Sequence, residues 1–146
     1  MKRFKYPLEG LMRLKKARLD QEILKMEQIA AGIAQVEQFR LALGRESREA
    51  TRAAALASTA EGWQLAALDR FRRYAIEQDQ RFAAELLSLA QRLDVQRQAV
   101  VEANKNVRML ELLKERRLAG WREEVSKEEE AIVSDLVVAQ WGRRPQ

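Results

Sequence analysis

Apolar residues recur along this chain at alternating intervals of three and four residues. In the first half, Met12, Leu19, Met26 and Ile33 lie seven residues apart. In the second half, one longer register holds Leu65, Leu68, Ala75, Phe82, Leu86, Leu89, Leu93, Val100, Ala103, Val107 and Leu110. An apolar residue at about every 3.5 positions forms the seam of a coiled coil, and such a seam requires a partner helix. The pattern therefore predicts two long helices with one narrow apolar seam each.

Polar residues interrupt the second seam at several positions. Its first interruptions are Arg72, Asp79 and Gln96. Beyond Leu110 the register meets Lys114 and Arg117, and it resumes at Leu118, Trp121, Val125, Ile132 and Leu136. A charged group on a buried seam is costly unless a partner neutralises it. We therefore expect the seam to be weak around Lys114 and Arg117, where a partner surface is able to pair them.

The residues between the apolar positions favour helix throughout. No proline lies between Pro7 and Pro145, and the chain has six glycines. Ala, Leu, Glu, Gln, Lys and Arg, which lose least on entering a helix, fill most other positions. We expect an all-α protein that forms a single coiled-coil domain. Its predicted parts are a helix over about 8–53, a turn over about 54–59 and a helix over about 60–139 within the domain 1–146.

The turn is placed by a capping pattern. Residues Ser58 to Glu61 fit a capping box, in which Ser58 caps the second helix and Glu61 reaches back to it. Gly44 and Gly62 are competing positions for the turn. Folding at this point gives a long antiparallel two-helix hairpin whose second arm overhangs the first, and Trp121 on the overhang is expected to have no partner within the chain. A continuous helix that dimerises is the alternative.

The composition excludes most catalytic chemistry. The chain contains neither Cys nor His, and it has no Gly-rich phosphate loop or nucleophile elbow. The acidic pair Glu123 and Glu124 and the acidic run 128–130 are expected to form a solvated face, because adjacent helical residues point in different directions. No apolar run is long enough to span a membrane, and no signal peptide is recognisable. We therefore predict a cytoplasmic protein that is not an enzyme and needs no cofactor.

Positive charge is concentrated at the start of the chain. Residues 1–18 carry seven Lys and Arg residues against a single Glu, whereas the whole chain has a net charge of +5. In the hairpin this segment lies near Lys114, Arg116 and Arg117. Nucleic acid is one possible partner for such a patch. Because no stacking aromatic residues are interleaved with it, a protein partner is the better prediction and no specific nucleic acid is expected.

A few aromatic residues lie near the expected tip of the hairpin. Phe71 and Tyr74 are one step off the seam, so they are either an exposed pair or, if the register shifts locally, part of the core. Exposed aromatic residues are typical of docking sites. Hairpin geometry with a turn over about 54–59 places Phe39 and Leu43 opposite them.

Three segments resemble the FliJ family of flagellar export proteins. The first is the start of the chain from Phe4-Lys5-Tyr6-Pro7 through Lys15, and the second is Phe71-Arg72-Arg73-Tyr74. The third is Val107 through Arg117, with Leu110-Glu111 and Lys114-Glu115-Arg116-Arg117 at its heart, followed by Trp121 and Glu128. The order and spacing of the segments agree with the family over nearly the whole chain. The tail departs from it, since Ser134-Asp135-Leu136-Val137 keeps only part of the family's ending.

The resemblance implies a non-enzymatic stalk of the flagellar type III export apparatus. Family members are antiparallel coiled coils similar to the central stalk of rotary ATPases. The implied partners are a hexameric export ATPase, the cytoplasmic domain of the membrane export gate, and export chaperones. The implied location is the cytoplasmic face of the inner membrane. An injectisome stalk, or a general or nucleic-acid-binding coiled-coil scaffold, is the alternative.

The expected binding residues fall into two groups. The residues expected to enter the ATPase ring are Leu11, Leu14, Lys15, Lys114, Arg116, Arg117 and Trp121. The residues expected to meet the export gate are Phe39, Leu43, Phe71 and Tyr74.

Overall fold

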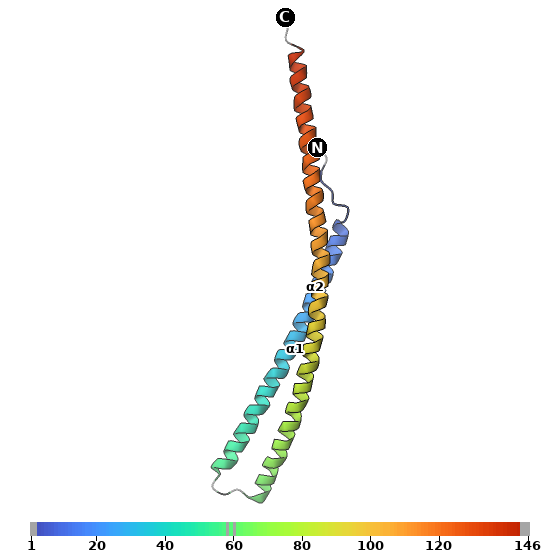
Figure 1. Ribbon diagram of the computed structural model, residues 1–146. Coiled ribbons are helices and arrows are strands. Elements are labelled where there is room, and N and C mark those ends of the chain that lie inside the picture. The colour runs from blue at the N-terminus through green and yellow to red at the C-terminus, as the bar shows by residue number, and fades with distance from the viewer. Residues whose placement is uncertain (1–2, 58, 60, 144–146) are drawn as a thin grey trace. The chain divides into compact units, whose positions relative to one another are not determined.

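Two long helices make up almost all of the computed structural model, which describes residues 3–57, 59 and 61–143 (Figure 1). Helix α1 spans Glu9–Leu56 and helix α2 spans Gly62–Trp141. The described residues contain no strand. The two helices contact each other, so the prediction of an all-α, two-helix hairpin is confirmed.

Helix α1 begins two residues after Pro7, close to the position that the fixed backbone angle of proline favours. The backbone N–H of Glu9 donates to the carbonyl of Tyr6 at 3.2 Å, and that of Met12 donates to Leu8 at 2.9 Å. Glu9 lies in the first turn. A carboxylate there is favourable because the helix dipole is positive at its N-terminus.

The connection between the helices lies later in the chain than the predicted turn over about 54–59. Helix α1 continues through Gly44 to Leu56, and α2 begins at Gly62. The capping box is also displaced by three residues: the backbone N–H of Glu61 donates to Oε1 of Gln64 at 3.0 Å. Gln64 thus takes the role expected of Glu61. Ser58, the expected cap, lies outside the described residues.

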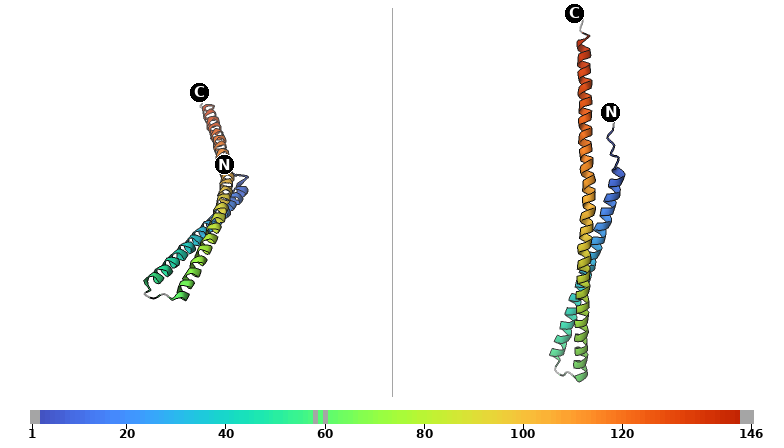
Figure 2. Two further views of the ribbon diagram at one scale, coloured as in Figure 1. Left: turned by 60° about the horizontal axis from the view of Figure 1, so that its bottom comes forward. Right: turned by 45° about the vertical axis from the view of Figure 1, so that its right-hand side comes forward.

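The chain divides into two compact units, which we call the terminal unit (residues 1–19 and 102–146) and the hairpin unit (residues 20–101). Within each unit the helices are antiparallel, because later residues of α1 face earlier residues of α2 (Figure 2). The interactions that show this order are Glu22–Gln96, Arg40–Asp79 and Thr51–Arg72 in the hairpin unit, and Glu9–Lys114 and Lys16–Glu111 in the terminal unit.

Few of the described side chains are buried, as expected when one helix meets only one other. The buried hydrophobic residues are Tyr6, Met12, Val36, Ala75, Ala103 and Val107. Most other seam residues, including Ile23, Met26, Leu89 and Leu93, are half-buried. No polar residue among those described is buried. Each unit is therefore held by a narrow contact line with water on both sides.

Candidate protein-binding surfaces

The segment before α1 packs against α2 in the terminal unit. The Tyr6 hydroxyl donates to the carbonyl oxygen of Leu110 at 2.9 Å, and the Tyr6 side chain is only 8% exposed. The ring of Phe4 lies 5.8 Å from the ring of Trp121, with the planes tilted by 55°. The expectation that Trp121 has no partner within the chain is therefore wrong. An extended segment advances about 3.3 Å per residue against about 1.5 Å in a helix, so a few residues reach far along α2.

The Lys114 ammonium group has an ion-pair partner within the terminal unit. Its Nζ lies 3.0 Å from Oε2 of Glu9 and 5.9 Å from the centroid of the Tyr6 ring. Because both charged side chains are more than a third exposed, this pair contributes little stability. Arg117 is exposed, and Leu118 is half-buried in its place. Of the two cations predicted to interrupt the seam, only Lys114 faces it.

The predicted ring-binding residues all lie in the terminal unit, but they do not share one face. Lys114 and Trp121 are seven residues apart and lie on the same side of α2. Arg116 is rotated by about 200° from Lys114 around the helix axis. On α1, Leu14 is rotated by a similar angle from the buried Met12. Together these side chains surround the helix pair and do not form a single patch.

Several positive side chains of the terminal unit are paired with carboxylates. Lys16 lies 3.7 Å from Glu111, and Arg108 lies 3.5 Å from the same carboxylate. Arg116 and Arg117 are exposed and form no ion pair with the described part of the chain. These two arginines are therefore the cations of the family-like segment that remain available to a partner.

Phe71 and Tyr74 have different environments in the hairpin unit. Phe71 is half-buried, whereas Tyr74 is 53% exposed and Ala75 is buried. Their rings lie 6.5 Å apart. At this point of α2, Phe71 lies on the side that faces α1. Arg72, which was expected on the seam, is exposed. The aromatic pair is thus neither wholly exposed nor wholly core.

Phe39 lies away from Phe71, contrary to the expected pairing. The ring of Phe39 is 6.3 Å from that of Phe82, while Arg72, next to Phe71, donates to Oγ1 of Thr51 at 3.2 Å. Leu43 lines a groove together with Ala75. The cause is the later connection between the helices, because moving the turn along the chain shifts every cross-helix pair.

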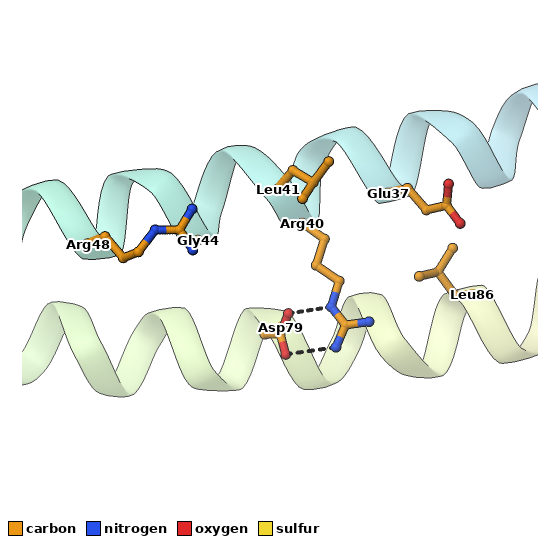
Figure 3. Close-up of a pocket in the computed structure, with 7 residues that line it drawn as sticks. All are labelled: Glu37, Arg40, Leu41, Gly44, Arg48, Asp79 and Leu86. Carbon is orange, nitrogen blue, oxygen red and sulfur yellow. Dashed lines mark hydrogen bonds and ion pairs between the residues drawn. The ribbon is translucent and has the colours of Figure 1, made fainter.

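An ion pair that the sequence analysis did not anticipate lies in the wall of an open groove in the hairpin unit (Figure 3). Nε and Nη2 of Arg40 donate to the two carboxylate oxygens of Asp79 at 2.6 and 3.1 Å. This hydrogen bonding lowers the pKa of Asp79 and raises that of Arg40. The groove has a volume of about 500 Å³ and is lined by Glu37, Arg40, Leu41, Gly44, Arg48, Asp79 and Leu86.

The three polar interruptions of the second seam all have partners on α1. Asp79 pairs with Arg40, and Arg72 donates to Thr51. The side-chain amide of Gln96 donates to both the backbone carbonyl, at 2.9 Å, and the carboxylate of Glu22. Arg40, Thr51 and Glu22 were not recognised from the sequence. A signal was present, since a polar residue at a seam position calls for a complementary residue on the opposite helix.

Neither a metal-binding cluster nor a membrane-spanning helix occurs among the described residues. The described residues contain no group of three or more Asp and Glu side chains arranged to hold a metal ion. Among the same residues, neither helix has a stretch apolar and long enough to cross a bilayer. Comparisons of the chain with protein-family models, with curated proteins and with solved structures found no match.

Proposed function

We propose that this protein is a non-enzymatic stalk of a flagellar type III export apparatus at the cytoplasmic face of the inner membrane. In this proposal the terminal unit binds a hexameric export ATPase. The hairpin unit binds the cytoplasmic domain of the export gate, and the protein also contacts export chaperones. The proposal rests on the resemblance to the FliJ family and on the two-helix architecture that the resemblance implies.

The observation that carries the proposal is the distribution of exposed groups around the terminal unit. Leu11, Leu14, Arg116 and Arg117 are all exposed, and they lie on several sides of a helix pair. A ring contacts an inserted rod from all sides, so residues that surround the rod suit it better than a one-sided patch does. Lys114 is paired with Glu9, and the ring of Trp121 packs against that of Phe4, so both residues have partners within the unit.

The test measures ATP hydrolysis by a purified export ATPase with and without this protein. Reversing Arg116 and Arg117 together to Glu is expected to abolish the stimulation at low salt, because it inverts the two cations of the segment 107–117 that have no ion-pair partner among the described residues. Lys114 is left unchanged, since Lys114→Glu would place a second carboxylate beside Glu9 and disturb the fold. Circular dichroism at 222 nm checks that the variant remains helical.

A second adjacent arginine pair on α2 provides the matched control. Arg72 and Arg73 are also exposed but belong to the hairpin unit, where Arg72 donates to Thr51 and Arg73 lies 2.8 Å from Asp69. Their reversal to Glu changes the net charge equally and, where circular dichroism shows an unchanged helix content, should leave the stimulation intact. The roles exchange in a binding assay with the cytoplasmic domain of the gate, where the 72–73 reversal weakens binding and the 116–117 reversal does not. Undiminished stimulation by the 116–117 variant at low and moderate salt would exclude the terminal unit as the ring-binding part.

A further inference from the structure

The last part of α2 presents an apolar face that the protein does not cover. Val125 is the last half-buried residue, and every described residue from Ser126 to Arg143 is exposed. Ile132, Val133 and Leu136 are each 59% exposed, and Val137 is 48% exposed. These residues occur as two pairs at a spacing of four, so they occupy one side of the helix. We call them the distal apolar face.

Contiguous exposed apolar residues on one helix face mark interaction sites, because their contact with water is unfavourable. The distal face has the spacing that two packed helices use elsewhere in this protein. A stretch of about 20 helical residues is about 30 Å long, which suffices for a small helix–helix contact. The occupant that fits this shape is an amphipathic helix.

Carboxylates border the distal apolar face on both sides. Glu124, Glu128 and Asp135 lie at intervals of four and seven residues and line one edge, and Glu123 and Glu130 lie toward the other. The described part of the chain offers no ion pair to the first three. Residues 122–135 contain six acidic residues and two basic ones. The charge beside the face is therefore strongly negative and not neutralised within the chain.

We infer that the distal apolar face binds an amphipathic helix of another protein in which basic residues flank the apolar stripe. Paired through this face, two copies of the present chain would bring their acidic borders together, which is unfavourable. The same borders repel the phosphate groups of nucleic acids and of anionic lipids. The inference uses residues beyond Trp121 and holds whether or not the terminal unit enters an ATPase ring.

The probe is a pair of synthetic peptides of about 21 residues, or three heptads, with identical apolar positions. One carries Lys at every flanking position and the other carries Glu. Binding of each fluorescently labelled peptide to the full-length protein is measured by fluorescence anisotropy at low salt. We expect the Lys peptide to bind and the Glu peptide to bind at least about tenfold more weakly, which corresponds to about 1.4 kcal/mol.

Two variants separate the apolar contribution from the charged one. Exchanging Ile132 and Leu136 for Asn is expected to abolish binding of the Lys peptide. Reversing Glu124, Glu128 and Asp135 to Lys is expected to exchange the preference, so that the Glu peptide becomes the tighter ligand. Because the substituted side chains are exposed, both variants should retain the helical circular dichroism and the ATPase stimulation of the unchanged protein.

Matched controls lie on exposed parts of α2 in the hairpin unit. Reversing Glu77, Glu85 and Asp94 to Lys changes the net charge equally and should leave the peptide preference unchanged. Equal binding of both peptides would show that binding is nonspecific and does not depend on charge. Loss of the preference in this control would show that the net charge of the protein sets it and not the carboxylates beside the distal apolar face. Absence of binding to either peptide would overturn the inference. Self-association through Ile132 and Leu136 in analytical ultracentrifugation would replace it with a contact between copies of this chain.

Discussion

The two units of this protein bury their hydrophobic residues to different extents, although each contains two helices in contact. Two helices in contact leave most of their side chains open to water, and Val36 and Ala75 are accordingly the only buried hydrophobic residues among those described in the hairpin unit. The terminal unit has a shorter stretch of α1 but buries Tyr6, Met12, Ala103 and Val107. One difference is the non-helical segment before α1, which adds contacts to α2 through Tyr6 and Phe4. Tyr6 itself becomes one of the buried residues of the unit.

The seam of the hairpin unit carries more polar contacts than that of the terminal unit, where Lys114 pairs with Glu9. Arg40–Asp79 and Glu22–Gln96 join its helices at positions where a coiled coil normally places apolar residues. Such contacts add little stability at an exposed seam, but only one alignment of the helices satisfies them. We conclude that the terminal unit buries more apolar surface, and that polar partners set the alignment of the helices chiefly in the hairpin unit.

The largest expected effect comes from truncating a buried side chain in the terminal unit. Met12→Ala should lower the free energy of unfolding by about 2–3 kcal/mol, near the lower end for a Met-to-Ala change because a narrow seam is able to collapse. Leu93→Ala in the hairpin unit should cost about half as much, since Leu93 is only half-buried. Urea unfolding followed by circular dichroism measures both. If Leu93→Ala lowered the free energy of unfolding more than Met12→Ala does, the terminal unit would not be the better-buried of the two.

A smaller effect is expected from the hydrogen bond of the non-helical segment. Tyr6→Phe removes the donor to Leu110 and should cost about 1 kcal/mol in unfolding free energy. Tyr74→Phe is the matched control, because the Tyr74 ring is largely exposed and its hydroxyl has no hydrogen bond within the described residues. Equal melting temperatures for the two variants would mean that the Tyr6 hydroxyl does not hold the segment in place.

The smallest effect, and one that depends on pH, concerns Asp79. The pKa of Asp79 is lowered in the folded protein, chiefly by its hydrogen bonds to Arg40. A lowered pKa means that the carboxylate adds stability above its unfolded value of about 3.9, and this contribution is lost as the pH falls through the folded value. Asp79→Asn should therefore lower the melting temperature slightly at pH 7 and not at strongly acidic pH. In an Arg40→Gln background the same substitution should have no effect at either pH.

The period of the apolar residues was sufficient to predict the two helices and most of the inward-facing positions. Leu89, Leu93 and Val107 lie where the 3,4 register places them. The pattern was wrong near Phe71. It placed Arg72 on the seam, but the half-buried residue is Phe71, one position earlier. A seven-residue repeat and a helix of about 3.6 residues per turn drift apart, so a long seam shifts where no strong apolar residue holds it.

The candidate surfaces were predictable only in part, because they depend on contacts between residues far apart in the sequence. The pairing of Phe39 with Phe82 followed from a turn that begins a few residues later than its capping pattern indicated. The contact between the rings of Phe4 and Trp121 involves a segment that carries no periodic signal. The sequence predicted correctly which residues with a clear helical register face inward. It did not predict the partners of residues whose position depends on the connection between the helices or on the non-helical segment before α1.

By itself the amino-acid sequence determined that this chain forms two helices with single seams, because propensity and apolar spacing act over a few neighbouring residues. Only the tertiary structure decided which residues meet across the seam. It gave Asp79 and Lys114 their partners, and it laid Tyr6 over α2. The physical reason is that each such pair joins positions tens of residues apart, and its alignment is set jointly by the length of the connection, the drift of the helical register and the path of the segment before α1.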